Sequence, residues 1–346
     1  GNPRKVDVKG DIILVGNASP LITVASPGNT GLEHTLIAPN NIKHSAGNIY
    51  LYHATSARVA LKIGGTNSAS YSRVNGNISL HRIIMDKGTN ADSTFTFNNS
   101  VTLSHPSNLP IKPITFMNGC LVLNHPDIDI NLSSGGGNAE IVATSALEIQ
   151  QGKARLSGSG VGLILSGRLG LSNTGQFLAN GASNNYIQYT NSNKSVLSIS
   201  DSGLLEVAES IKGATTFTNA NIRYYQTGGN VKVGTLGSSL NSPTFEIRNN
   251  NSRFRFLGGS IYILRKGENN VAFLADSCNA DVDPVWASMY FGDGASTPVS
   301  TIFAVNSAIP FPNLLLQGNN AFTVKQESKP MVVLGDFTIG SGKTFQ

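Results

Sequence analysis

The sequence has little charge, few aromatic residues and almost no cysteine. Charged residues make up 13% of the 346 residues and aromatic residues 7%, and the cysteines are Cys120 and Cys278. Two cysteines exclude a disulfide-rich scaffold and a cysteine-based zinc site. We expect both to be small, buried, apolar residues.

Long apolar runs and basic clusters are also missing. No run approaches the roughly 18 apolar residues of a membrane-spanning helix, so we do not expect a membrane-spanning protein. The net charge is +5, but Lys and Arg are scattered singly, which argues against a nucleic-acid partner. The weakly basic surface is either simply solvated or favours acidic polysaccharide and other envelope components.

Glycine, serine, threonine and asparagine supply most of the polarity, and 37 residues are glycine. A disordered chain would have fewer large aliphatic residues and a higher net charge, so we expect a folded protein. No signal peptide precedes the strand-like segment after Lys5, and the chain stops at Gln346 within another strand-like segment. We therefore expect an internal part of a longer chain.

One short pattern recurs: glycine, any residue, apolar, any residue, apolar. The alternating apolar positions predict half-buried strands, and the glycine allows a corner before each strand. The clearest pair, residues 98–106 and 118–126, aligns without a gap. Nine copies begin with glycine, and two degenerate copies begin at Asn99 and Ser145; the glycines are Gly10, Gly47, Gly76, Gly119, Gly167, Gly203, Gly229, Gly259 and Gly335.

The intervals between copies predict an all-β fold, a right-handed parallel β-helix (β-solenoid) with about 20–30 residues per coil and loop insertions. A string of β-sandwiches or an antiparallel barrel is less favoured, because Asn-Gly and Asp-Gly hairpin signals are rare. We expect one continuous domain over residues 1–346, about twelve to fourteen coils and a rod of roughly 60 Å. Residues 265–312 fit the pattern poorly and are expected to be a loop-rich part of the same solenoid.

Stacking of successive copies makes the prediction specific. Outward positions such as Ser79, Thr102, Glu148 and Lys232 should face solvent, and almost no helix is expected. The inward positions should form two apolar ladders, one of Ile49, Ile78, Val101, Leu121 and Leu147, the other of Leu51, Leu80, Leu103, Leu123 and Ile149.

Polysaccharide lyases and glycosidases use the same architecture, so we searched for catalytic carboxylates. Asp127 and Asp129 would lie on one strand face about 7 Å apart, but outward residues alternating with an apolar core explain them better. Asp276, Asp281 and Asp283 match no calcium-loop spacing, which favours a solvated loop.

Other candidate groups also lack a partner at the spacing their chemistry needs. The six histidines avoid metal-ligand spacing, and His105-Pro106 and His125-Pro126 suggest a repeated corner instead. Ser159 lacks the residue pattern of a nucleophile elbow. Gly135–Gly137 and Gly228-Gly229 do not open helices, so they predict no phosphate site. We assign no catalytic, cofactor-binding or metal-binding residue.

The repeat segments carry a resemblance to a known family. Ser202–Val207, Phe256–Ile263 and Val333–Phe345 are similar to repetitive regions of very large secreted surface proteins of Bacteroidetes. The resemblance is sharpest from about residue 114 to the end. It implies a cell-surface or secreted protein exported by the type IX secretion system, as are gliding-motility adhesins. The secretion-signal domain of that family is not within these residues.

The sequence thus favours a non-catalytic structural or adhesive module, a rigid stalk or display scaffold of a bacterial cell-surface protein. Its expected partners are surface polysaccharide or secretion and outer-membrane attachment proteins. One alternative is a polysaccharide-binding or polysaccharide-degrading β-helix protein. A trimeric fibre is disfavoured because outward positions are polar. Any binding is expected in the loops near residues 265–300.

Overall fold

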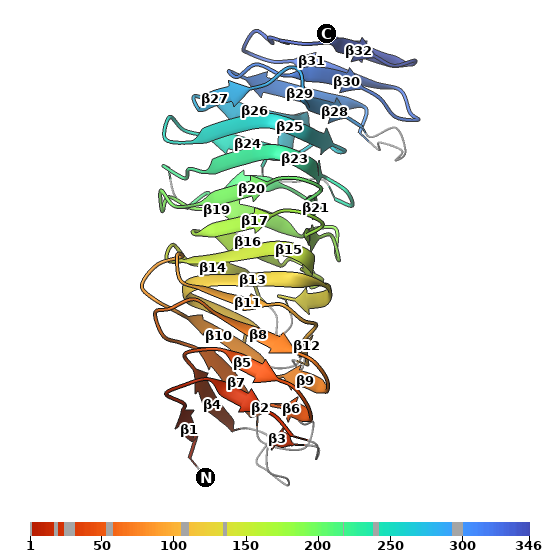
Figure 1. Cartoon of the computed structure of the whole chain (residues 1–346). Helices are drawn as coiled ribbons and strands as arrows, with labels where there is room; N and C mark the ends of the chain where they lie inside the picture. Colours follow the sequence, from red (N-terminus) through yellow and green to blue (C-terminus); the bar gives the residue numbers. More distant parts are fainter. Residues whose placement is uncertain are drawn as a thin grey trace.

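The chain folds as an all-β parallel solenoid of about 11 turns, which confirms the predicted fold class. Strands make up about 55% of the computed structural model, and the described residues contain one short 3-10 helix, η1 (Glu268–Asn270). Figure 1 shows an elongated molecule with the chain ends at opposite poles. The structure describes residues 2–16, 20–23, 32–52, 58–104, 111–133, 137–216, 218–237, 242–292 and 300–346.

One parallel ladder runs through nearly the whole molecule, and we call it the common ladder. Each turn contributes one strand, paired in parallel with the strands of the turns before and after it. It comprises β2 (Ile12–Leu14), β5 (Ile42–His44), β8 (Ala69–Arg73), β11 (Thr94–Phe97), the middle of β13 (Ile114–Asn131), the start of β15 (Ser145–Arg155), β17 (Arg168–Leu171), β20 (Val196–Ile199), the starts of β23 (Arg223–Val233) and β25 (Arg253–Ile263), and β27 (Asn279–Val282).

Two N-terminal side ladders complete the first four turns. The first is continued by the start of β13, whereas the second ends at β12 within the described residues. The first comprises β1 (Lys5–Asp7), β4 (Glu33–Ala38), β7 (Arg58–Ile63) and β10 (Arg82–Asp86), and the second comprises β3 (Leu21–Thr23), β6 (Asn48–Tyr50), β9 (Asn77–Leu80) and β12 (Thr102–Leu103).

Two different C-terminal side ladders complete the later turns. The first begins with the ends of β13 and β15 and continues through β18 (Gln176–Ala179), β21 (Leu204–Val207), the ends of β23 and β25, β28 (Ala287–Phe291), β30 (Asn313–Leu316) and β32 (Phe337–Ile339). The second comprises β14 (Ala139–Ile141), β16 (Gly162–Leu165), β19 (Tyr186–Tyr189), β22 (Ile211–Gly213), β24 (Phe245–Arg248), β26 (Val271–Asp276), β29 (Ile302–Ser307), β31 (Phe322–Gln326) and β33 (Lys343–Phe345).

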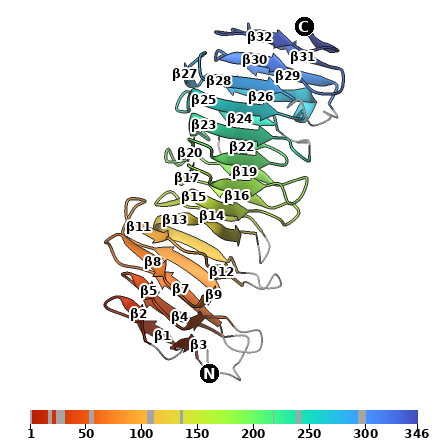
Figure 2. The same ribbon diagram turned by 45° about the vertical axis from the view of Figure 1, so that its right-hand side comes forward.

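The side ladders change at β13, an 18-residue strand that passes through three ladders. Its start pairs with β10, its middle with β11 and β15, and its end with β15 alone. The β10–β13 pairing shifts register between Met85 and Asp86, and such a bulge bends a sheet. Figure 2 shows the N-terminal turns leaning away from the axis of the later turns at this point.

The turns differ in length, and most are longer than the interval between residues 98–106 and 118–126, the clearest pair of copies. Ile149 pairs with Leu171 across a short turn, whereas Gln226 pairs with Phe256 across a much longer one. Longer turns mean fewer turns, so the structure has about 11 rather than the expected twelve to fourteen. At a rise of about 4.8 Å per turn the axis is about 53 Å long.

The interior is a continuous apolar stack enclosed by the ladders. Alternation along each strand sends every second side chain inward, as in Phe177, Leu205 and Val231, which follow one another on the first C-terminal side ladder and are fully buried. Burying apolar side chains in this way contributes about 1.5–3 kcal/mol for each large residue. The stack therefore stabilises neighbouring turns against one another along the axis.

The glycine before a strand is needed for one of two reasons at several corners, although Gly10 shows neither. Gly229 has φ +67°, and a Cβ there would lie 2.2 Å from the carbonyl oxygen of Gly203 in the turn below. Gly203 and Gly167 are not in the left-handed region, but a Cβ on Gly167 would lie 2.2 Å from the oxygen of Val142. Some corners therefore need the backbone conformation and others need the space.

The predicted apolar ladders are correct at both ends and wrong in the middle. Ile49 pairs with Ile78, and Leu121 pairs with Leu147. Leu121, however, stacks on Phe95 of the common ladder and not on Val101, which follows the second N-terminal side ladder. The glycine motif thus marks a corner of the solenoid but not always the same corner, so the two copies that align best in sequence belong to different ladders.

The predicted outward positions do lie on the outer surface. Thr102 is exposed, whereas Glu148 and Lys232 are half-buried because each pairs with a charged residue of a neighbouring turn. Within residues 265–312, β26 to β29 pair with the strands of the preceding turns. Trp286 stands in the turn before β28 and is 74% exposed.

Candidate functional site

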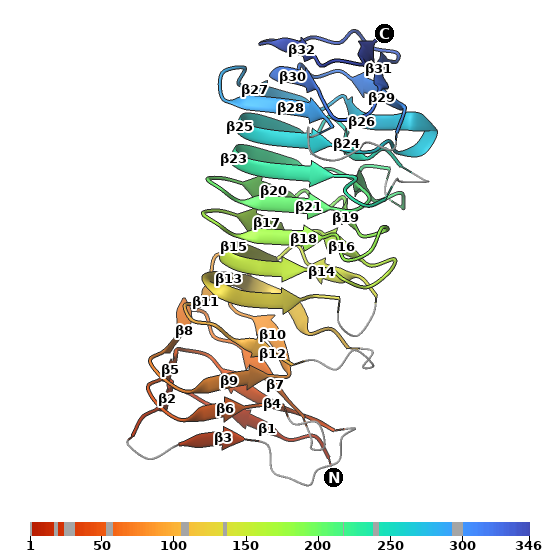
Figure 3. The same cartoon turned by 90° about the vertical axis from the view of Figure 1, so that its right-hand side faces the viewer.

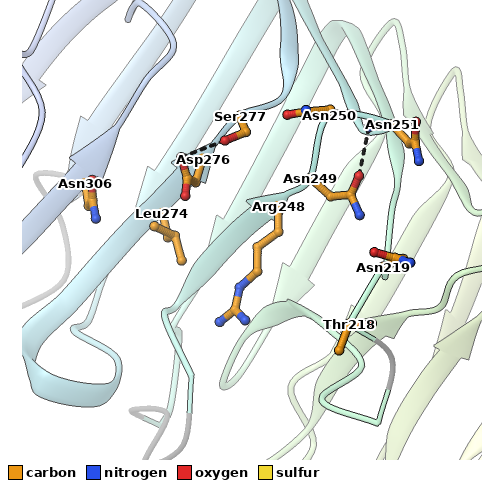
Figure 4. A pocket seen from close by; sticks show the side chains of 10 residues that line it. All are labelled: Thr218, Asn219, Arg248, Asn249, Asn250, Asn251, Leu274, Asp276, Ser277 and Asn306. Atoms are coloured by element: carbon orange, nitrogen blue, oxygen red, sulfur yellow. Dashed lines mark hydrogen bonds between the residues drawn. The ribbon is translucent and has the colours of Figure 1, made fainter.

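An open depression of about 750 Å³ lies on the second C-terminal side ladder, where β24 and β26 end. Its side chains come from successive turns of the solenoid (Figure 4). Asparagine dominates the lining, so we call it the asparagine groove; it is lined by Thr218, Asn219, Arg248, Asn249, Asn250, Asn251, Leu274, Asp276, Ser277 and Asn306.

A tight turn after β24 presents the amides to this groove. Asn249 has φ +84°, a left-handed conformation that asparagine tolerates better than most residues. Its side-chain oxygen accepts a hydrogen bond from the Asn251 amide at 2.9 Å, as shown by a dashed line in Figure 4. This arrangement is a side-chain-closed turn, which asparagine favours. The local sequence Asn249-Asn250-Asn251 therefore both makes the corner and lines the groove.

The two charged residues that line the groove, Arg248 and Asp276, are each already paired with a residue outside its lining. The Arg248 guanidinium pairs with Glu246, which is 1% exposed, and the Lys329 ammonium donates to Asp276. The hydrogen bond from Lys329 is the largest cause that lowers the pKa of Asp276. Asp276 is therefore ionised at neutral pH and does not provide a general acid. With neutral amides around these pairs, the groove is suited to hydrogen bonding with a polar ligand.

The carboxylates considered for glycoside cleavage are not joined in a catalytic pair. The Asp129 carboxylate forms ion pairs with two residues of the next turn, with Arg155 Nε at 2.8 Å and with Lys153 Nζ at 3.2 Å. The Asp127 side chain is 77% exposed and lies 3.8 Å from the His125 ring nitrogen. Asp129 is thus a cross-turn ion-pair partner, and neither residue lines the asparagine groove.

The three acidic residues considered for calcium lie on different ladders and face different partners. Asp276 ends β26, Asp281 lies in β27 and pairs with Arg255 at 3.1 Å, and Asp283 accepts a hydrogen bond from the Val285 amide at 2.7 Å. Across the described ranges no group of three or more His, Cys, Asp or Glu side chains is placed to hold a metal ion. The expected solvated loop is therefore wrong for Asp276 and Asp281, which lie in strands, and fits only Asp283.

The histidines that the structure describes have separate structural partners. His44 is buried, and its two ring nitrogens lie 3.2 Å from the Tyr71 hydroxyl and 2.9 Å from the Gly47 carbonyl oxygen. His81 is buried beside Glu33 at 3.2 Å. His53 and His105 lie outside the described residues, so the predicted repeat of the His-Pro corner is tested only at His125, which lies within β13.

Both cysteines have their thiols held in the protonated form. Cys120 is buried with Val122 and Ala146 on the outer side of the common ladder. Burial is the largest cause that raises the pKa of Cys120 to about 12, and burial raises that of Cys278 to about 11. Because thiolate is the reactive form, neither residue is a nucleophile at neutral pH. The expected buried, apolar role fits Cys120, while Cys278 is half-buried against the core.

The remaining sequence candidates do not form a site in the described parts. The Ser159 hydroxyl is exposed and donates to the Asn184 side chain at 3.4 Å. Gly228 and Gly229 lie inside β23. Gly135 and residues 293–299 of the candidate binding loop lie outside the described residues.

Sequence reasoning missed the asparagine groove because its lining residues come from different turns. It also missed a cluster of arginines on the common ladder, at Arg223, Arg253 and Arg255. A signal for that cluster was present. The spacing from Gly229 to Gly259 equals the spacing from Arg223 to Arg253, so the glycines already placed the two arginines one turn apart.

Comparisons with family models, with curated proteins and with solved structures found no match. In the described residues no helix is long and apolar enough to cross a membrane. The geometry itself defines the class: the chain is a repeat protein of the parallel β-solenoid type.

Proposed function

We propose that this chain is a non-catalytic scaffold of a bacterial cell-surface protein, holding surface loops at fixed positions along a stiff axis. The observation that carries the proposal is the common ladder, which joins about 11 turns without changing partners at β13. Because each turn contacts only its neighbours, length and loops can vary while the stack is kept. The surface location rests on the resemblance of the repeats to secreted surface proteins of Bacteroidetes, exported by the type IX secretion system.

The state of the carboxylates supports a role without catalysis. A glycosidase needs one carboxyl group to act as an acid and another to act as a base or nucleophile. Asp129, Asp276 and Glu246 are each held in an ion pair with Lys or Arg. Release of sugar products from neutral or acidic polysaccharides by the purified protein would contradict this part of the proposal.

The scaffold role predicts that a complete turn is dispensable. Ile199 pairs with Gln226, so removing residues 200–226 joins Ile199 to Thr227 and takes out one complete turn in register. At the junction β25 then lies over β20, the end of β23 over β18, and β24 over β19. We expect the shortened protein to unfold cooperatively and to be displayed on the cell. Removing half that length, residues 200–213, breaks the register and serves as the matched control.

Surface display is measured by adding protease and antibody to intact cells that make the protein. The proposal expects the epitope to be accessible before lysis for the native chain and for the one-turn deletion. Detection only after lysis would overturn the surface location. Display of the half-turn deletion as efficient as that of the one-turn deletion would overturn the requirement for stacked turns.

A further inference from the structure

The outer face of the common ladder carries a dense group of cations on β23 and β25. Arg223 and Tyr225 point outward from β23, and Arg253 and Arg255 occupy the paired positions on β25. The three arginines are exposed and the tyrosine is half-buried, while Tyr224 and Phe254 between them point into the core. Three guanidinium groups and one aromatic ring therefore share a patch two strands wide.

Several strand cations elsewhere on the surface pair with a carboxylate in a neighbouring turn. Arg155 pairs with Asp129 at 2.8 Å, and Lys232 pairs with Glu206 at 3.4 Å. Arg168 pairs with Glu148 at 2.5 Å. These pairs balance charge along the axis without help from outside the chain.

Arg223 and Arg253 depart from this pattern. The neighbours of Arg223 along the ladder are Val196 and Arg253, and the next neighbour of Arg253 is Asn279. Within the described residues neither guanidinium has a hydrogen-bond or ion-pair partner. Two like charges on paired positions about 4.8 Å apart destabilise a sheet unless an anion lies between them.

The positive charge continues into a hollow one turn below. This hollow has a volume of about 280 Å³ and is lined by Arg168, Lys194 and Arg223, with Asp92 as its acidic residue. Arg168 is neutralised by Glu148, whereas Lys194 is exposed. We call Lys194, Arg223, Arg253 and Arg255 the basic track; its residues belong to three consecutive turns, about 10 Å along the axis.

We propose that the basic track binds an acidic polysaccharide whose chain lies along the solenoid axis, with its carboxylates on Arg223 and Arg253. Arg255 shows the geometry, because the Asp281 carboxylate one turn away reaches its Nε at 3.1 Å. A uronate carboxylate would do the same for the two unpaired arginines, as guanidinium groups favour carboxylates. The rise per turn is comparable to the length of one pyranose unit, and the Tyr225 ring offers an apolar surface to a sugar face.

The basic track carries too little positive charge to favour a nucleic acid as its ligand. Only four cations are involved, and Asp281 partly neutralises one of them. Nucleic-acid binding surfaces rely on many phosphate contacts and on broad positive fields. This inference goes beyond the proposed scaffold role and does not depend on it, because a scaffold without any ligand would keep the same fold.

The test measures binding of the whole chain to an oligogalacturonate by calorimetry at low salt, with a neutral dextran oligomer and a single-stranded DNA oligonucleotide as comparison ligands. The key variant is Arg223→Gln with Arg253→Gln. The matched control is Lys153→Gln with Arg155→Gln, which removes the same charge from a neighbouring ladder, where both cations pair with Asp129.

We expect the Arg223/Arg253 variant to bind oligogalacturonate about tenfold or more weakly, as expected for lost charge-assisted hydrogen bonds, and the control to change by less than about threefold. Affinity should fall as salt rises, and dextran should not bind. Equal weakening by both variants, unchanged binding by the key variant, no binding by the native chain, or tighter binding of DNA would each overturn the proposal.

The melting temperature of the Arg253→Gln variant without ligand shows whether a loss of binding comes from the track or from a weakened fold. Because Arg223 and Arg253 repel each other and are exposed, Arg253→Gln should leave the melting temperature unchanged or raise it. A clear fall would mean that these arginines stabilise the fold, and the loss of binding could then no longer be assigned to the track. None of these outcomes bears on the scaffold proposal, which the turn deletions test.

Discussion

The turns before β13 and the turns after it share the common ladder but fill their interiors differently. The first turns are mainly aliphatic and bury ionisable side chains at their corners, including His44, His81 and Lys87. Ring contacts in these turns are few, as among Tyr71, Phe95 and Phe97, whereas the later turns stack many rings from β23 onward. Within the described residues the buried polar groups after β13 are Ser, Thr, Asn, Gln and one Glu. Figure 3 shows both parts as stacks of strands, with their side strands arranged differently.

The aromatic stack of the later turns links strands of different ladders. Tyr224 and Phe254 are stacked at 5.1 Å between ring centroids, and Phe245 meets both rings edge-on. Phe245 also stacks on Phe273 at 5.6 Å. Such contacts run both up the axis and across the interior, so they tie the common ladder to the second C-terminal side ladder.

In the early turns, hydrogen bonds from a buried lysine also link successive turns. The Lys87 ammonium donates to the carbonyl oxygens of Pro39 at 2.8 Å and Gly64 at 2.9 Å, which belong to two earlier turns. Burial lowers the pKa of Lys87. The comparison teaches that one ladder can be stabilised either by apolar stacking or by buried polar bridges between turns.

The largest expected effect is in the aromatic stack. Phe254→Ala should lower the free energy of unfolding by about 3–5 kcal/mol, because it removes a fully buried ring that contacts three others. Urea unfolding measures the change. Tyr262→Ala, which removes a ring on the outer surface stacked on Tyr290, is the control and should cost no more than about 1.5 kcal/mol.

Hydrogen exchange sharpens the same comparison. Loss of Phe254 should speed amide exchange in β23 to β27 more than in β4 to β10. Equal acceleration in both regions would mean that the molecule opens as a single unit, and the distinction between the two regions would then have no energetic meaning.

An intermediate effect is expected for the buried lysine. Lys87→Met keeps most of the side-chain volume but leaves the carbonyls of Pro39 and Gly64 without this donor, which should cost about 1–3 kcal/mol. The measurement is urea unfolding with exchange in β4 to β10 as the local readout. Lys5→Met, which removes an exposed lysine of β1, serves as the control and should have little effect. Stability unchanged by Lys87→Met would show that the early turns do not depend on this bridge.

The smallest effect is one that depends on pH. Burial alone would raise the pKa of Glu33, but hydrogen bonds from His81 and Arg82 and the charge of Arg82 lower it below its ordinary value of 4.5. A lowered carboxyl pKa stabilises the fold above about pH 4.5, and this contribution is lost as the pH falls through the folded-state pKa.

Glu33→Gln should therefore lower the melting temperature at pH 7 and have a decreasing effect as the medium is acidified below pH 4.5. Glu140→Gln, which removes an exposed carboxylate of β14, is the matched control and should have little effect at either pH. A Glu33→Gln effect of equal size at both ends of this range would contradict the account of the early turns.

Much of the fold could be predicted because the alternation and the corner glycines are local. Ile49 and Ile78 were aligned correctly from their glycines alone. The partner of Leu121 was not, because the strand Thr94–Phe97 follows Ser93 instead of glycine and so carried no motif. Leu121 stacks on Phe95 and not on Val101 because the side ladders change at β13, and no local sequence pattern marks that change.

The candidate sites were less predictable for a related reason. The asparagine groove needs Asn249 and Asp276 on successive turns, and its lining carboxylate, Asp276, is held in an ion pair by Lys329. Lys329 is far from Asp276 in the sequence, so their pairing depends on the lengths of the intervening turns. By contrast, the Arg223–Arg253 neighbourhood follows from one interval that the glycines already displayed.

The central claim is that the common ladder continues through β13 while the side ladders change. It predicts that Thr96 lies over Val122, whereas direct stacking of the two aligned copies would place Thr102 there. Paired residues about 4.8 Å apart are within the Cα range of a disulfide or a short thiol cross-linker. The test compares two cysteine pairs in a chain that also carries Cys120→Ala and Cys278→Ala.

The measurement is the yield of intramolecular cross-link in dilute solution, read by mass spectrometry of proteolytic fragments. The structure predicts efficient cross-linking in Thr96→Cys/Val122→Cys and little in Thr102→Cys/Val122→Cys. The reverse result would mean that residues 98–106 and 118–126 stack as consecutive copies of one repeat. In that case the common ladder would not pass through β13, and the two-region account would be wrong.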